Sequence, residues 1–257
     1  MTRNAATSDY NALQTQFERR LSHGLQAMAS YTWSHSIDIA STETLITTPE
    51  ASLDPRVDRV PSNFDIRHSV AAAVTYDLPI PGRDRAVRAI FGGWSMDAML
   101  RARSATPITV LVGGGRSLFS IRNVARPNLV PNVPLYIRDK TAPGGKRINP
   151  AAFAVPALGV QGTLGRNSVR GFPLSQVDFA LRRQFTFAER LHLHLRAEFF
   201  NLFNHPNFAP PVPFLPQPSF GRSPRMFNQN FGFDAGLLPR YQVGGPRSIQ
   251  LAMKLQF

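Results

Sequence analysis

The chain has 257 residues, a formal net charge of +13 and a sequence pI near 11.3, and 43% of its residues are hydrophobic. This composition allows one large domain or two small ones and does not by itself indicate a membrane protein. No stretch approaches the roughly 18 uninterrupted apolar residues of a membrane-spanning helix, so a helical membrane protein is excluded. The positive charge favours a basic nucleic-acid-binding domain, but the arginines are scattered along the chain rather than concentrated in one run.

Three further features bear on compartment and fold. The chain contains no cysteine, which excludes disulfides and thiolate chemistry and fits an oxidising envelope compartment. Its 22 prolines crowd residues 49–61, 127–156 and 206–246, which predicts strands separated by long loops. The first seven residues contain no apolar segment that could act as an export signal, so the chain either stays inside the cell or lacks its natural N-terminus.

Strict alternation of apolar and polar residues predicts β-strands, because successive side chains of a strand point to opposite faces. In chain order, the seven windows that show it are residues 10–21, 25–38, 64–78, a weaker one beginning at residue 94, 177–187, 191–203 and 249–257. Every window has one apolar face, whereas the other face carries Asp, Glu, Arg, Gln or His in nearly every strand. A dry core tolerates such groups poorly, and a watery or plugged lumen accommodates them.

The connections between these windows contain three, about 25, about 15, about 65, three and about 43 residues. This alternation is typical of an outer-membrane barrel, with short periplasmic turns and long extracellular loops. We therefore expect an all-β fold, an antiparallel transmembrane β-barrel segment of about seven strands that occupies residues 1–257 as one domain. Seven is an odd number and cannot close a barrel of the usual even type, so we expect an incomplete barrel.

The two short connections predict the register of two hairpins, because facing residues must point to the same side of the sheet. Leu21 would face Leu25 across a three-residue loop in which Gly24 supplies a positive φ. In the second hairpin Phe187 would face Leu191, and Arg190 would occupy the position that favours glycine. We expect a strained or longer turn there.

A soluble β-sandwich also alternates, and the placement of aromatic residues separates it from a membrane barrel. If the C-terminus is periplasmic, the outward aromatics fall near strand ends in two belts about 25 Å apart, as in a lipid-facing barrel. The extracellular belt is Tyr31, Trp33, Phe64, Phe199 and Phe203. The periplasmic belt is Tyr76, Trp94, Phe185, Phe187 and Phe257. The outward Arg19 and Arg183 lie near periplasmic strand ends, where a long side chain can reach water.

Several segments resemble the C-terminal barrel of TonB-dependent receptors of the Oar-like class, and the resemblance covers nearly the whole chain. These segments are residues 64–68, 76–79, 92–94, 149–153, 165–167, 170–171, 196–208 and 247–257. Members of this class have a plug inside a barrel of about 22 strands and an N-terminal region that engages the TonB complex. The chain matches only the last seven strands, so we expect it to be the C-terminal portion of such a barrel.

The resemblance implies a location in the outer membrane and a role in energy-dependent uptake of a bulky ligand. The implied partners are outer-membrane lipid, lipopolysaccharide, the barrel-assembly machinery and, in the full-length member, the TonB complex. The family's closing strand, which the assembly machinery would engage, corresponds here to Ile249, Leu251, Met253, Leu255 and Phe257. Two alternatives stay open: a surface adhesin or structural barrel without transport, and a soluble basic all-β protein that binds nucleic acid.

Few residues indicate chemistry beyond this. His192 and His194 share a strand face and could bind a metal, but neither a carboxylate nor a third histidine joins them in sequence, so we expect no metal site. We expect no enzymatic activity, because no nucleophile motif accompanies the charged residues. We also expect no cofactor and, because the arginines are scattered, no nucleic-acid partner. Loop cations that could contact anionic lipopolysaccharide are Arg116, Arg122, Arg126, Arg138, Lys140, Lys146 and Arg147.

Overall fold

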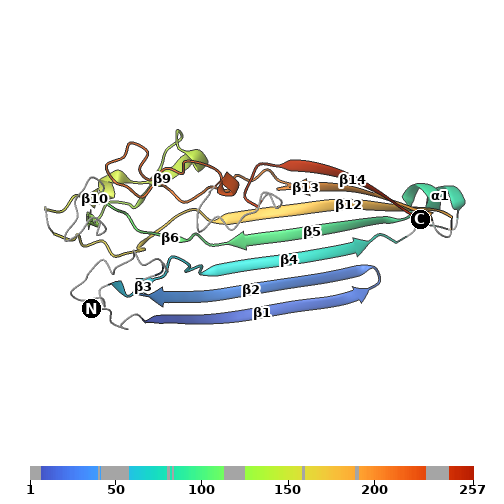
Figure 1. Ribbon diagram of the computed structural model, residues 1–257, viewed down its shortest axis with the longest axis horizontal. Helices are drawn as coiled ribbons and strands as arrows, with labels where there is room; N and C mark the ends of the chain where they lie inside the picture. Colours follow the sequence, from blue (N-terminus) through green and yellow to red (C-terminus); the bar gives the residue numbers. More distant parts are fainter. Residues whose placement is uncertain are drawn as a thin grey trace.

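The computed structural model describes residues 7–39, 41, 58–79, 82, 84–112, 125–157, 160–188, 191–229 and 243–257. Its main element is one antiparallel sheet in which seven long strands lie side by side in chain order (Figure 1). These strands are β1 (Ser8–Ser22), β2 (Leu25–Asp38), β4 (His68–Asp77), β5 (Trp94–Arg103), β12 (Leu174–Ala188), β13 (Leu191–Phe200) and β14 (Ser248–Gln256). The predicted all-β fold is confirmed. Within the described residues β1 and β14 are the two edges of the sheet, which is not closed into a barrel.

The registers predicted for both hairpins are confirmed along most of their length. Arg19 pairs with Ala27 and Phe185 pairs with Leu193, which are the partners that the predicted Leu21–Leu25 and Phe187–Leu191 pairs imply. At the first turn the register shifts so that Ser22 faces Leu25, which leaves two residues in the turn rather than three. Gly24 has the expected positive φ of 78°, and a Cβ there would lie 2.5 Å from the carbonyl oxygen of Asp77. At the second turn the register also shifts, so that Leu191 faces Ala188 rather than the predicted Phe187. Residues 189 and 190 of this turn lie outside the described residues, and with them the strained turn expected at Arg190.

Two predicted windows are longer than the strands observed. The window 64–78 becomes a strand only at His68, because the Asp65 amide donates to the Ser62 carbonyl at 3.0 Å and turns the chain. The window 191–203 ends at Phe200, because Asn201 has a φ of 51°. The Asn201 side-chain amide then donates to the carbonyl groups of His205 and Gly245 at 2.8 and 2.7 Å. Alternation continued past both strand ends, but these side-chain and turn contacts set the limits.

Long and short connections lie at opposite ends of the sheet, as the sequence predicted. The three long ones leave the end that carries the N-terminus, and the turns and the C-terminus lie at the other end (Figure 1). The connection from β4 to β5 contains α1 (Arg85–Phe91), which was not predicted and is capped by the Asp84 carboxylate accepting from the Ala86 amide at 2.9 Å. In the described part of the chain, no helix has the length and hydropathy required of a membrane span.

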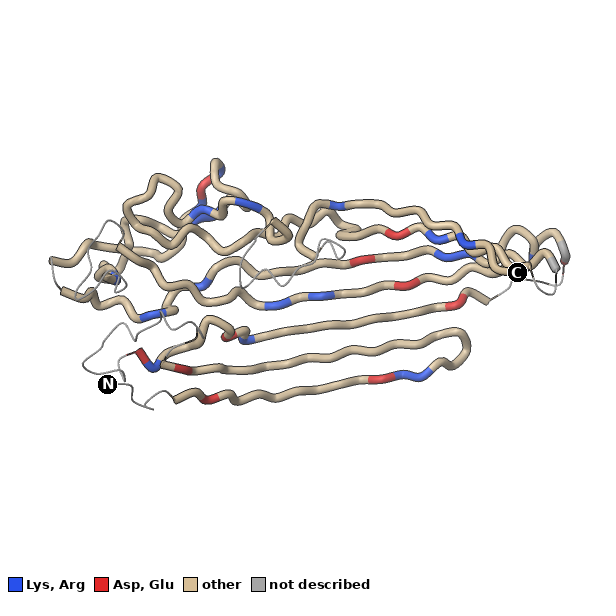
Figure 2. Tube along the Cα trace, viewed as in Figure 1, with Lys and Arg blue, Asp and Glu red and all other residues tan. Residues whose placement is uncertain are grey.

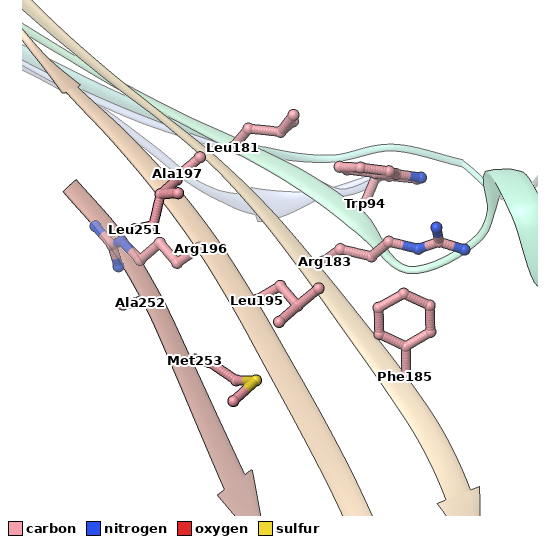
Figure 3. A pocket seen from close by; sticks show the side chains of 10 residues that line it. All are labelled: Trp94, Leu181, Arg183, Phe185, Leu195, Arg196, Ala197, Leu251, Ala252 and Met253. Atoms are coloured by element: carbon pink, nitrogen blue, oxygen red, sulfur yellow. The ribbon is translucent and has the colours of Figure 1, made fainter. Parts of the chain in front are cut away.

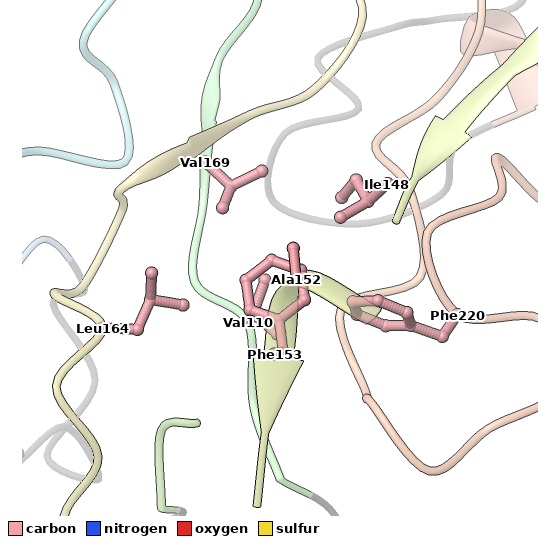
Figure 4. Close-up of a cluster of buried hydrophobic side chains, with 7 residues drawn as sticks. All are labelled: Val110, Ile148, Ala152, Phe153, Leu164, Val169 and Phe220. Atoms are coloured by element: carbon pink, nitrogen blue, oxygen red, sulfur yellow. The ribbon is translucent and has the colours of Figure 1, made fainter. Parts of the chain in front are cut away.

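The long connections fold together into a compact unit, here called the loop cap and defined as the described parts of residues 58–67, 104–173 and 201–229. Its short elements are β3 (Val60–Pro61), β6 (Pro107–Ile108), β7 (Asn128–Leu129), β8 (Tyr136–Arg138), β9 (Lys146–Ile148), β10 (Phe153–Ala154) and β11 (Val169–Arg170), with the 3-10 turns η2 (Pro143–Gly145), η3 (Pro150–Ala152) and η4 (Phe227–Gln229). A buried hydrophobic cluster holds them together (Figure 4): Val110, Ile148, Ala152, Phe153, Leu164, Val169 and Phe220. This cluster therefore lies in the loop cap rather than against the long sheet.

The apolar face of the long sheet is open to its surroundings. Val74 is 39% exposed, Leu195 is 38% exposed and Leu251 is 79% exposed. A β-sandwich would bury these side chains against a second sheet. The arrangement therefore excludes the closed hydrophobic interior that a soluble sandwich requires.

Candidate barrel wall and its two faces

The polar face is organised around Asp97 of β5. Its carboxylate accepts from the Thr75 hydroxyl of β4 at 2.9 Å and from Nη2 of Arg182 of β12 at 3.0 Å, and the Arg182 Nε lies 2.7 Å away. On β13, Arg196 lies 4.0 Å from Asp97 and 2.8 Å from Glu198. We call these five residues the Asp97 ladder. Because Arg182 and Arg196 share an acidic neighbour, their mutual repulsion is offset.

The charge on this face is concentrated on one side of the sheet. In Figure 2 the middles of β1, β2 and β4 carry no charged residue, whereas β5, β12 and β13 carry both signs. Beside the Asp97 ladder lies a hollow of about 370 Å³, to which Arg101, Asp178 and Phe200 contribute. The hollow offers both donors and acceptors, which suits a hydrated or polar occupant.

The opposite face is apolar over most of its area, with the arginines Arg19 and Arg183 near the short turns as exceptions. Cross-strand pairing places apolar residues in uninterrupted rows, of which one is Val74, Ala98, Phe179, Phe199 and Ile249. The next row toward the short turns is Tyr76, Met96, Leu181, Ala197 and Leu251. Because side chains alternate along a strand, the polar rows lie on one face of the sheet and the apolar rows on the other. The two faces therefore suit different surroundings, one polar and one apolar.

Comparison with protein families decides what kind of wall this is. A family model described as an outer membrane beta barrel domain matches residues 1–250. The chain belongs to this family. The apolar rows of the barrel therefore face lipid, the Asp97 ladder faces the lumen, and the protein is located in the outer membrane. No curated protein and no solved structure matches the chain.

The orientation of the barrel follows from its connections, because outer-membrane barrels have short turns on the periplasmic side and long loops outside. The loop cap is thus extracellular, and α1 and the hairpin turns are periplasmic. The outer-membrane location leaves the soluble nucleic-acid-binding alternative without support.

The aromatic residues assigned to the extracellular belt lie at unequal positions. Phe199 is the penultimate residue of β13, but Tyr31 and Trp33 lie in the middle of β2, level with the start of β4. Tyr31 is fixed there by a 2.9 Å hydrogen bond between its hydroxyl and Nδ1 of His68. Phe64 and Phe203 lie outside the strands, with 63% and 72% of their surface exposed.

The aromatic residues assigned to the periplasmic belt gather near the short turns. Tyr76 is close to the end of β4 and Trp94 begins β5. Phe185 and Phe187 stack near the end of β12, with ring centroids 6.2 Å apart. The Trp94 Nε1 donates to the Ile90 carbonyl of α1 at 3.3 Å, so the helix and the belt are linked.

The closing strand β14 pairs with β13 on one side and is a free edge on the other within the described residues. The five residues assigned to barrel assembly are all exposed on its lipid-facing side, from Leu255 at 55% to Phe257 at 94%. They are Ile249, Leu251, Met253, Leu255 and Phe257.

Buried ion pairs hold the loop cap together and attach it to the end of β2. Arg166 donates to the Asp38 carboxylate at 2.5 Å and to its carbonyl at 2.8 Å, across 128 residues of sequence. Arg126 donates to Asp58 at 3.0 Å, and both side chains are nearly inaccessible. Alternation in the strands gave no signal for these pairs, because each joins segments that are far apart in the sequence.

Asp65 is the centre of a second, larger network. Its inaccessible carboxylate accepts from Arg170, from His35 Nδ1 at 3.0 Å and from the Ser36 amide at 2.9 Å, and Arg67 Nε lies 3.1 Å away. Burial alone would raise the pKa of Asp65, but the hydrogen bonds from Arg170, His35 and Ser36 outweigh it and lower the pKa below 3.8. The predicted window 64–78 places Asp65 and Arg67 on the polar, lumenal face of a strand, which is wrong because the strand begins only at His68 and both residues belong to the loop cap.

The loop cations predicted to contact lipopolysaccharide divide into three groups. Arg126 is buried against Asp58, and the Arg147 side chain is 14% exposed and donates to the Phe220 carbonyl at 3.0 Å, so neither is a free surface cation. Arg138, Lys140 and Lys146 are exposed. Arg116 and Arg122 lie outside the described residues.

The described residues contain no group of three or more His, Asp or Glu side chains that could hold a metal ion. The His192 Nδ1 lies 3.3 Å from the Thr186 hydroxyl and 3.5 Å from the Gln184 amide nitrogen, both on β12. His192 thus lies among neutral hydrogen-bonding neighbours, whereas His194 is paired with Lys254 of β14.

Replacing Arg182 by Gln should lower the unfolding free energy by about 1 kcal/mol, because the side chains of Arg182 and Asp97 are 37% and 26% exposed and water screens part of their attraction. The check is urea unfolding in phospholipid vesicles for Arg182→Gln, Asp97→Asn and the double variant. The two single effects should not add, since each removes the same contact. Fully additive effects would show that Arg182 and Asp97 do not stabilise each other in the folded barrel.

Proposed function

We propose that this chain forms the C-terminal part of the wall of a TonB-dependent receptor of the Oar-like class, which takes up a bulky ligand across the outer membrane. The proposal is supported by the family resemblance of residues 64–68 and 196–208, and by the architecture of a polar lumenal wall beneath a folded extracellular cap. The receptor binds its ligand at the surface and passes it along the lumenal face when the TonB complex supplies energy.

The observation that carries the proposal is the Asp97 ladder. A charged group that is taken out of water costs free energy unless it is paired and hydrogen-bonded, so charges on an interior wall require water or a polar plug opposite them. Five interacting residues spread over four strands give a wall of this kind, and the hollow of about 370 Å³ beside them leaves room for a polar occupant. A small barrel that only anchors a surface domain fills its interior with side chains instead.

A surface adhesin is the alternative that the loop cap itself favours. The cap has its own hydrophobic cluster and buried ion pairs, so it can present a fixed surface outside the cell. Its exposed Arg138, Lys140 and Lys146 are proposed contacts for the phosphates of lipopolysaccharide. An adhesin of this kind requires no contact with the TonB complex.

Contact with TonB therefore distinguishes the two functions. Cells that produce the full gene product should be treated with formaldehyde, and the barrel should be captured from detergent-solubilised outer membranes with an antibody against the loop cap. We expect TonB in the captured material and none from a strain in which the gene is deleted. A folded barrel that is recovered in quantity from the outer membrane without TonB would contradict transport and favour the adhesin.

A further inference from the structure

The lipid-facing side of the sheet contains a groove near its periplasmic end. Its volume is about 440 Å³, and it extends over β12, β13 and β14 with Trp94 of β5 at its rim (Figure 3). Barrel closure would add strands beside β14 and would not cover this face. The groove therefore stays open to the bilayer.

The shape of the groove follows from one small residue. Ala197 of β13 lies in the same cross-strand row as Leu181 of β12 and Leu251 of β14. Its methyl group is shorter than the side chains on either side, so the row has a depression at its centre. Leu195 and Met253 form the next row toward the periplasm and continue the apolar lining.

Of the two arginines that line the groove, Arg196 belongs to the Asp97 ladder, and Arg183 lies at the periplasmic end. The Arg183 guanidinium lies between two aromatic rings, 4.2 Å from the Phe185 centroid and 4.9 Å from the Trp94 centroid (Figure 3). One terminal nitrogen donates to the Ala89 carbonyl of α1, whereas Nε has no hydrogen-bond partner among the described residues. The rings and the helix hold the guanidinium at the lipid surface, where a planar cation matches the oxygen atoms of a phosphate.

We propose that this groove binds one anionic glycerophospholipid of the periplasmic leaflet, with an acyl chain over Ala197 and the phosphate on Arg183. The apolar lining takes the hydrocarbon, and the cation sits at the depth at which a headgroup begins. The other outward arginine at the periplasmic end, Arg19, lies on β1, where every residue is exposed, and it is not part of the groove. Both arginines therefore carry the same charge, but only Arg183 lies at the groove.

Native mass spectrometry of the full-length protein, purified in mild detergent, tests this directly. Dioleoyl phosphatidylglycerol and dioleoyl phosphatidylcholine are added at equal concentrations, and retained lipids are counted. We expect one phosphatidylglycerol with about fivefold preference over phosphatidylcholine, the ratio that one arginine near an anionic headgroup supplies. Arg183→Gln should abolish the preference, and the matched control Arg19→Gln should retain it.

A second variant probes the acyl chain separately. Ala197→Phe fills the depression and should reduce retention of both lipids severalfold, whereas Ala72→Phe, at a lipid-facing position on β4, should not. Heat-modifiable mobility on gels shows that each variant is folded. Equal retention of the two lipids by the parent protein, or unchanged retention by Arg183→Gln and Ala197→Phe, would overturn the proposal and indicate bulk lipid only. The outcome is independent of TonB, so it can fail while the transport proposal stands.

Discussion

Replacing Leu100 by Arg should destabilise the folded barrel by about 2–3 kcal/mol, because an arginine on a lipid-facing strand must enter hydrocarbon. Leu100 lies on β5 between Ala72 and Val177, both on the apolar face. Neither neighbour can pair with the new charge. Urea unfolding in phosphatidylcholine vesicles measures the change, and the fraction of protein recovered in the outer membrane reports it in cells.

The neighbouring residue provides the control. Met99 is also a large apolar residue, but it points to the lumen, where it faces Ala73 and Asp178. Met99→Arg should change stability by less than about 1 kcal/mol, because the new charge meets water and an opposite charge. Equal losses for the two variants would show that the faces do not differ in solvent, and the assignment of the apolar rows to lipid would be wrong.

Replacing Asp65 by Asn should lower the free energy of unfolding of the loop cap by about 3 kcal/mol, because Arg170 and Arg67 lose the carboxylate between them in a largely buried site. Only His35 and Ser36, near the end of β2, also contact this carboxylate, so the strands should keep their pairing. Trypsin added to intact cells should therefore cut the cap faster by on the order of 100-fold, while the barrel keeps its heat-modifiable mobility.

The exposed ion pair of Asp9 and Arg59 is the matched control, since its side chains are 51% and 43% exposed. Asp9→Asn should leave the rate of cleavage within a factor of about two. A cap that resists trypsin equally in the parent and in Asp65→Asn would show that the Asp65 network contributes little.

The same network predicts how the cap responds to acid. The pKa of Asp65 is lower in the folded cap than its ordinary value of 3.8, so the carboxylate binds its proton less readily when folded. Its stabilisation is therefore fully present above that value and is lost as the pH falls through the folded-state pKa. Intact cells should be exposed briefly to acid and then treated with trypsin. The cap should be intact after exposure at pH 5 and open only after exposure well below pH 3.8.

Sequence alternation located the strands because the information is local. Each of the residues from Leu191 to Phe199 reveals its face through its neighbours two positions away, and a hairpin such as Phe185 with Leu193 is restricted to a few registers by its short turn. The same signal failed at Phe64 and Phe203, where alternation continued but a turn ended the strand. It was also silent about α1, which is held by contacts to Trp94 and Arg183.

The amino-acid sequence by itself determined that this protein is an antiparallel sheet with one polar and one apolar face and with its long loops at one end. The two-residue alternation, the hairpin register and the length of each connection can all be read from residues that are close together in the sequence. Only the tertiary structure decided what those loops do. Arg166 reaches Asp38 across 128 residues and Arg126 reaches Asp58 across 68 residues, so no local pattern records either contact. The groove beneath Arg183 has the same origin, because its depth depends on which residue of a neighbouring strand lies beside Ala197.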